Sequence, residues 1–166
     1  MEEQDIIKVL KKFENELKAN DFNSLYKKIK DVDRCHFTQF FIDHDIDPLK
    51  YVTGKTPYYF AYKCNFKNTR LRIPESITEI GRYSFARTNI TYLYIPSSVE
   101  KFHSGAFALC DDLKEVVMDG CPKLDDYGRL GTENTIIRMN CSEQEFKKKN
   151  YPYRSRFDYS NIKFLK

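Results

Sequence analysis

An internal repeat is the feature that most constrains this chain. The segment LRIPESITEIGRYSFA (residues 71–86) recurs as LYIPSSVEKFHSGAFA (residues 93–108), so that Leu71 matches Leu93 and Phe85 matches Phe107. A unit of this length cannot bury its own apolar side chains, so successive units must stack and share one continuous core. The sequence therefore predicts a short solenoid in which each coil is one copy of the repeat.

Apolar residues alternate before the proline of each copy and then recur along the rest of the coil. Alternation with period two indicates a strand whose alternate side chains point inward. Pro74 and Pro96 end these strands, because proline cannot donate a hydrogen bond to a sheet. We predict one short parallel strand per coil. The predicted core consists of the matched pairs Leu71 and Leu93, Ile73 and Ile95, Ile77 and Val99, Ile80 and Phe102, and Phe85 and Phe107.

The pattern continues beyond the two full copies. A third, decayed copy follows if the second contains one extra residue near Cys110, which makes Val116 and Met118 inward residues. TIIRM (residues 135–139) predicts a fourth strand, and SNIKFLK at the end of the chain predicts a last one. Ser142 and Glu145 have the spacing of a capping box, in which each side chain binds a free backbone N–H, and predict a helix over residues 143–150.

The N-terminal segment before the repeats predicts helices. Apolar residues at helical spacing predict an amphipathic helix over residues 4–18, a second helix after Asp21 or Asn23, and a third over residues 33–44. Asp47 followed by Pro48 predicts a short helix, since aspartate caps helices and proline fits their first turn. We expect an α+β protein: a helical N-terminal cap over residues 1–60, then a solenoid of three to four coils with a C-terminal capping helix over residues 61–166.

The repeat L-x-I-P-x-S-[IV]-x-x-[IF]-x-x-x-[SA]-F, followed by FALCDDL, resembles the BspA-like class of bacterial leucine-rich repeats. The resemblance covers residues 69–119 and extends through Tyr153. It departs from the family pattern at Phe102-His103, where the first copy has the usual Ile-Gly, and in the third copy, which lacks the proline. The resemblance implies a leucine-rich-repeat solenoid that binds a protein partner. The helical N-terminal region resembles that of small phage-encoded leucine-rich repeat proteins, which favours a phage or bacterial intracellular factor that binds and modulates a host macromolecule.

The charge, hydropathy and cysteine pattern of the chain indicate in which cellular compartment the protein is expected. The N-terminus MEEQDIIKV is acidic, unlike the start of a secretion signal, and no apolar run approaches the ~20 residues of a membrane-spanning helix. We expect a cytoplasmic protein without a membrane partner. The five cysteines are scattered and contain no CxxC pair, which predicts reduced thiols and neither a disulfide framework nor a zinc site.

The outward residues of the predicted strands form a candidate site. Stacking places Arg72, Tyr94, Val117 and Arg138 in one row, about 4.8 Å apart. Tyrosine and arginine are enriched at interface hot spots, so this face is predicted to bind a partner. An alternative stays open, in which these side chains only pack on one another in solvent. The predicted partner-binding residues are Arg70, Arg72, Tyr92, Tyr94, Glu115, Val117 and Arg138, with Ile136 beside them.

A second candidate is the basic C-terminal segment. Residues 138–166 carry eight basic and three acidic side chains, a net +5, whereas the rest of the chain carries −1. Cations interleaved with aromatic rings can hold phosphates and stack on bases, so nucleic-acid binding is the alternative function. The competing interpretation is a solvated helix followed by aromatic core residues. The residues of this alternative site are Lys147, Lys148, Lys149, Tyr151, Tyr153, Arg154 and Arg156.

Catalytic, cofactor and metal sites are not predicted. The acidic series Asp43, Asp45 and Asp47 lacks the glycine and glutamate that a calcium loop needs. His36 and His44 lie eight residues apart and His103 is alone in its coil, so we expect solvated or packed histidines rather than metal ligands. Cys110 is expected to be a buried structural thiol rather than a nucleophile paired with His103. Phosphate-binding glycine loops, GxSxG and HExxH are absent from the sequence, so we expect a non-enzymatic protein.

Overall fold

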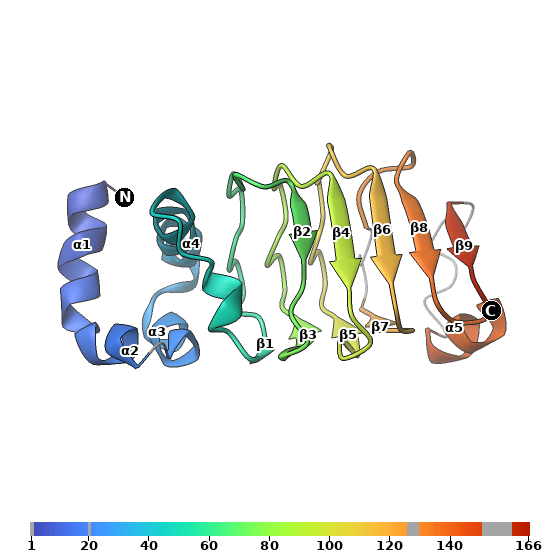
Figure 1. Ribbon diagram of the computed structural model, residues 1–166, viewed down its shortest axis with the longest axis horizontal. Helices are drawn as coiled ribbons and strands as arrows, with labels where there is room; N and C mark the ends of the chain where they lie inside the picture. Colours follow the sequence, from blue (N-terminus) through green and yellow to red (C-terminus); the bar gives the residue numbers. More distant parts are fainter. Residues whose placement is uncertain (1, 20, 126–129, 151–160) are drawn as a thin grey trace.

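Parallel strands stack along the long axis of the molecule, with helices at both ends (Figure 1). The computed structural model describes residues 2–19, 21–125, 130–150 and 161–166. The predicted strands form one five-stranded parallel sheet, in the order β2 (Arg70–Arg72), β4 (Tyr92–Ile95), β6 (Glu115–Met118), β8 (Ile136–Met139) and β9 (Ile162–Phe164). Leu93 is in register with Leu71 on one side and with Val116 on the other, which confirms both the repeat and the extra residue before the third copy.

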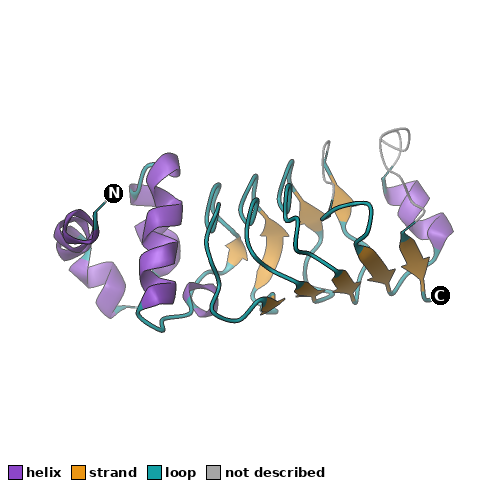
Figure 2. Ribbon diagram, turned by 90° about the horizontal axis from the view of Figure 1, so that it is seen from above, coloured by secondary structure: helices purple, strands orange, loops and turns teal. Residues whose placement is uncertain are grey.

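A second parallel sheet runs along the other side of the coils (Figure 2). Its order is β1 (Gly54–Lys55), β3 (Ile77–Ile80), β5 (Lys101–Phe102) and β7 (Lys123–Leu124). The expectation of one strand per coil therefore missed a strand in each of these coils. β1, β5 and β7 are only two residues long, and in β3 the two buried isoleucines, Ile77 and Ile80, are three residues apart, so none of these strands shows period-two alternation. Through β1, this sheet begins before the first full copy of the repeat.

The predicted core pairs lie between the two sheets. All ten of these side chains are at most 8% exposed. The rings of Phe85 and Phe107 stack with their centroids 5.1 Å apart and their planes 7° from parallel, and Phe60 meets the edge of Phe85 at 5.8 Å. Stacked rings from successive coils make the core continuous along the solenoid, as the repeat predicts.

Helices cover the N-terminal end of the solenoid. They are α1 (Glu3–Lys12), α2 (Glu14–Lys18), α3 (Phe22–Lys28) and α4 (Arg34–Asp43), with the 3-10 turns η1 (Asp31–Asp33) and η2 (Pro48–Lys50). The single helix predicted over residues 4–18 is wrong, because the chain bends at Phe13 (φ −116°, ψ 27°) and α2 starts in a new direction beside α3. The apolar spacing continues through the bend, since both Phe13 and Leu17 pack against the core, and so it could not indicate the break.

The predicted helix starts are formed by the expected side chains. Asp21 Oδ1 accepts the Ser24 N–H, and Asp47 Oδ1 accepts the Leu49 N–H, both at 3.0 Å. At α5 (Glu143–Lys149), Ser142 Oγ accepts the Glu145 N–H at 3.1 Å. The reciprocal half of the predicted capping box, from the Ser142 N–H to the Glu145 carboxylate, is not among the hydrogen bonds of the described residues, so only half of that box forms.

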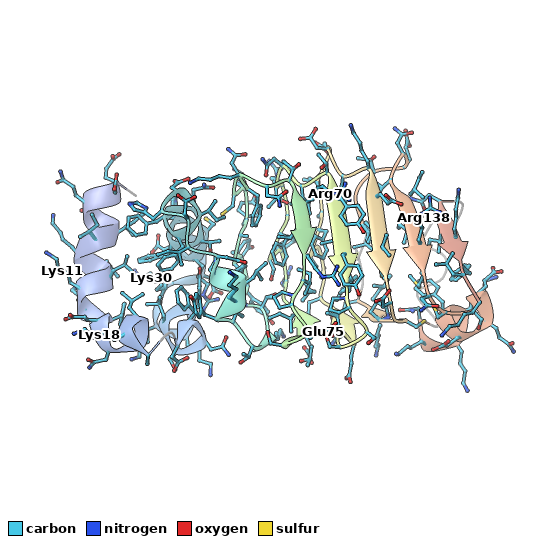
Figure 3. All side chains as sticks on the ribbon, viewed as in Figure 1. Lys11, Lys18, Lys30, Arg70, Glu75 and Arg138 are labelled. Carbon is cyan, nitrogen blue, oxygen red and sulfur yellow. The ribbon has the colours of Figure 1, made fainter. Side chains whose placement is uncertain are left out.

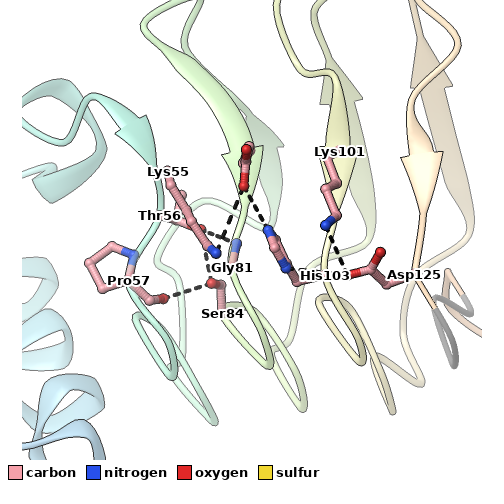
Figure 4. A network of polar contacts seen from close by, with 9 residues as sticks. Lys55, Thr56, Pro57, Gly81, Ser84, Lys101, His103 and Asp125 are labelled. Carbon is pink, nitrogen blue, oxygen red and sulfur yellow. Dashed lines mark hydrogen bonds and ion pairs between the residues drawn. The ribbon is translucent and has the colours of Figure 1, made fainter.

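Gly81 packs against the backbone where the first two coils meet. Its N–H donates to Thr56 Oγ1 at 2.7 Å, and Thr56 Oγ1 also hydrogen-bonds with Ser84 Oγ at 2.8 Å (Figure 4). A Cβ at this position would lie 2.1 Å from the Thr56 carbonyl oxygen. We expect Gly81→Ala to lower the free energy of unfolding by roughly 1–3 kcal/mol, because the backbone of the neighbouring coil must move.

Urea unfolding measures this effect. Gly120→Ala is the matched control, because a Cβ there would meet its nearest neighbour, Ser97 Cα, at 3.3 Å and needs only a small adjustment. Equal unfolding midpoints for the two variants would contradict the close contact between the coils.

Candidate functional site

The outward side chains of the five-stranded sheet form one continuous surface, which we call the ladder face. It comprises Arg70, Arg72, Tyr92, Tyr94, Glu115, Val117, Ile136 and Arg138. Successive side chains of a strand point to opposite faces of the sheet. The residues next to these along each strand point inward and are buried, whereas the ladder-face residues are half-buried or exposed. The register places Arg72, Tyr94, Val117 and Arg138 in one row, as predicted, and pairs Arg138 with Lys163 of β9, which the sequence analysis did not include.

Two arginines of β2 lie flat on two tyrosines of β4. The Arg70 guanidinium carbon is 4.0 Å from the centroid of the Tyr92 ring, and that of Arg72 is 3.8 Å from the centroid of Tyr94. A cation over an aromatic face is attracted by the ring's negative charge, and the planar guanidinium also stacks on the ring. The register alone brings these groups together, since Arg70 is paired with Tyr92 and Arg72 with Tyr94.

The charge of the ladder face is uneven along the solenoid. Arg138 Nε donates to Glu115 Oε1 at 2.8 Å, which neutralises the β6–β8 end of the face. Arg70 and Arg72 make no ion pair within the part of the chain that the structure describes. The face is therefore cationic and aromatic over β2 and β4, and neutral with the exposed Ile136 over β8, with Arg70 and Arg138 at its two ends (Figure 3).

Asp119 fixes one of the tyrosines. The Tyr94 hydroxyl donates to Asp119 Oδ2, and this hydrogen bond, followed by burial, raises the pKa of Tyr94 above its ordinary value. The phenol therefore stays neutral at physiological pH. Asp119 directly follows β6 and was missed by the sequence analysis, since the strand pattern ends one residue earlier.

The alternative nucleic-acid site is only partly described. Lys147, Lys148 and Lys149 occupy the last turn of α5, where Lys147 forms an ion pair with Glu143 and the other two are exposed. Tyr151, Tyr153, Arg154 and Arg156 lie outside the described residues. The structure thus places three of the seven residues on one helix and leaves nucleic-acid binding a prediction.

The acidic series has separate structural contacts. Asp43 accepts a hydrogen bond from Gln39, Asp45 pairs with Lys67 at 2.6 Å, and Asp47 caps η2. These contacts account for each carboxylate without a calcium loop.

Cys110 is a buried thiol whose Sγ donates to the Phe85 carbonyl at 3.1 Å. Burial raises its pKa, which disfavours the thiolate that a nucleophile requires.

His103 belongs to a polar ladder on the second sheet (Figure 4). Its Nε2 is 2.7 Å from Glu79 Oε2, and its Nδ1 is 3.3 Å from Asp125 Oδ2. The hydrogen bond from His103 lowers the pKa of Glu79. Lys55 and Lys101 complete the ladder, at 3.8 Å from Glu79 and 3.4 Å from Asp125 respectively. Sequence analysis treated His103 as isolated because its partners come from neighbouring coils.

These features define a class of protein: a solenoid whose coils present an open parallel sheet. A family model described as the BspA type leucine rich repeat region matches residues 35–149 in six copies. The chain belongs to this family, as the resemblance of its repeats implied. The match begins inside α4, well before residue 69. A comparison with curated proteins gave no match.

Family membership sets the general expectation for function. Leucine-rich repeats generally mediate protein–protein interaction, and their solenoids are typically non-enzymatic scaffolds. Within the described residues, all helices are too short or too polar to cross a membrane.

Proposed function

We propose that this protein is a non-enzymatic binding module that holds a protein partner on the ladder face. The observation that carries the proposal is the pair of stacks that Arg70 and Arg72 make on Tyr92 and Tyr94. Stacking fixes each guanidinium while its N–H groups remain in the plane of the group, available for a carboxylate. Side chains that are ordered before binding lose less entropy when a partner arrives.

The charge distribution indicates what the partner presents. Carboxylates fit opposite β2 and β4, because both arginines lack an ion pair among the described residues. An apolar side chain fits opposite Val117 and Ile136, the latter 39% exposed. The proposed partner is thus a protein whose contact surface combines acidic and apolar groups. The proposal extends to an intracellular phage or bacterial factor that modulates a host macromolecule, and this wider part is supported by resemblance alone.

Charge reversal of the face tests the proposal. We expect Arg72→Glu, and separately the double variant Tyr92→Ala and Tyr94→Ala, to weaken binding by roughly 30-fold or more, the effect of losing a hot spot of ~2 kcal/mol. The measurement is capture of a partner from a bacterial lysate on immobilised protein, then titration of the identified partner by calorimetry.

Arg82→Glu is the matched control, since Arg82 is exposed and lies outside the ladder face. It should bind as the unmodified protein does. Capture that is equal for Arg72→Glu and Arg82→Glu, with both variants folded by circular dichroism, would discard this face as the binding site.

A further inference from the structure

Three potential metal ligands meet near the C-terminal end of the solenoid. Cys121 lies between β6 and β7, Cys141 lies between β8 and α5, and Glu145 is in the first turn of α5. One ligand atom of each, the two sulfurs and a carboxylate oxygen, lie within 4.8 Å of one another. Coil stacking brings together the two thiols, and the cap of α5 by Ser142 turns Glu145 toward them.

These groups lack the contacts that their counterparts make elsewhere. The thiols of Cys64 and Cys110 donate to backbone carbonyls at 3.3 and 3.1 Å. Cys121 and Cys141 instead interact with each other. Glu145 does not make its expected capping-box bond, and among the described residues its carboxylate has no ion pair or hydrogen bond. Two thiols and a carboxylate therefore face one another without a structural partner that explains them.

We propose that Cys121, Cys141 and Glu145 bind a thiophilic divalent cation of the Zn²⁺ type. Thiolates select such ions over Mg²⁺ and Ca²⁺, which prefer oxygen ligands, and zinc accepts two thiolates with a carboxylate. Tetrahedral zinc with bonds of about 2.0–2.3 Å separates its ligand atoms by roughly 3.5–3.8 Å. Ligand atoms that already lie within 4.8 Å need only small side-chain rotations to reach this geometry.

The three proposed ligands differ in their exposure to solvent. Cys121 and Cys141 are 7% and 2% exposed, whereas Glu145 is exposed. The ion enters from the side of Glu145, and water takes the fourth position. Bound there, the ion ties the loop after β6 to the start of α5, so metal binding should also stabilise the C-terminal cap.

Lys149 carries a positive charge near the two proposed thiol ligands. Burial raises the pKa of both thiols above the ordinary value, and the Lys149 charge offsets only a small part of that rise, while the same charge repels an incoming cation. Replacement of Lys149 by glutamine therefore changes metal affinity without removing a ligand.

Cobalt titration tests the proposal. Full-length protein, reduced and freed of metal by chelation, is titrated with Co²⁺ and then with Zn²⁺. We expect an equimolar complex with a thiolate-to-cobalt charge-transfer band and the visible absorption of tetrahedral Co²⁺, both abolished by Zn²⁺. Cys121→Ser and Cys141→Ser should lose the charge-transfer band. Glu145→Gln should weaken binding at least 10-fold, and Lys149→Gln should strengthen it.

Glu143→Gln is the matched control, because Glu143 is an exposed acid in the same turn of α5 and pairs with Lys147 instead. It should bind cobalt as the unmodified protein does. A missing charge-transfer band in the unmodified protein, or a band that survives when both cysteines are serine, would overturn the proposal. If the cysteine variants unfold, the variants of the exposed residues Glu145 and Lys149 test the proposal instead. Equal cobalt affinity in Glu145→Gln, Lys149→Gln and Glu143→Gln would then overturn the proposal.

Discussion

Replacement of Phe107 by alanine is expected to lower the free energy of unfolding by roughly 3–5 kcal/mol. The ring is fully buried, stacks on Phe85 at 5.1 Å and meets the edge of Phe102 at 5.9 Å. The resulting cavity cannot close easily, because strands on both sides hold the coils at a fixed spacing. Domains of this kind have a total stability of ~5–15 kcal/mol, so the loss should shift the midpoint of urea unfolding strongly.

Two further variants show whether the loss comes from the core. Phe107→Leu retains most of the apolar volume and should cost clearly less than alanine. Leu109→Ala removes a neighbouring apolar side chain that is 56% exposed, so it should change stability by less than about 0.5 kcal/mol. A Phe107→Ala midpoint that matches that of Leu109→Ala would contradict the stacked core.

The repeat predicted which residues form the ladder face, because register follows from period. Once Leu71 and Leu93 occupy equivalent inward positions, the pleat assigns Arg72 and Tyr94 to the outer surface of neighbouring strands. The sequence could not predict the second sheet, whose strand β5 contains only Lys101 and Phe102. Strands that short form because the neighbouring coil supplies their hydrogen-bond partners, not because of their own residue pattern.

The thiol pair was missed for a related reason. The register of β6 and β8 pairs Val116 with Ile137, and the same offset carried forward pairs Cys121 with Ser142 rather than with Cys141. The cysteines therefore do not occupy equivalent positions of the repeat, and a search for matched positions does not pair them. Their proximity depends on the loops after the strands, whose paths the repeat does not determine.

Asn150 ends the second sheet in place of another strand. Among the residues that the structure describes, β7 is the last strand of that sheet, so no described strand pairs with the backbone groups on its outer side. Asn150 Oδ1 accepts the Leu124 N–H at 2.7 Å, and its Nδ2 donates to the carbonyls of Pro122 at 3.3 Å and Phe146 at 3.1 Å. The side chain is fully buried, and its amide joins the backbone of the last coil to the end of α5 through these three hydrogen bonds.

Asn150→Ala is therefore expected to lower the free energy of unfolding by about 2–6 kcal/mol, because it leaves the N–H of Leu124 and the carbonyl of Pro122 unpaired at ~1–3 kcal/mol each. Lys148→Ala, at an exposed position of the same helix, is the control and should cost little. Chemical unfolding followed by circular dichroism measures both. A loss equal to that of Lys148→Ala would show that water replaces the amide and that the sheet end is open.

Asn150→Asp separates the acceptor role of this side chain from its donor role. A carboxylate still accepts from Leu124, but it faces the Pro122 and Phe146 carbonyls without a proton to donate. Burial raises the pKa of such a carboxyl in the folded state above its unfolded value. The folded protein then binds more protons than the unfolded chain, so the stability of Asn150→Asp should increase as pH falls below neutrality, relative to the unmodified protein. A stability difference that stays constant with pH would mean that the donor half of the amide is not needed to close the sheet.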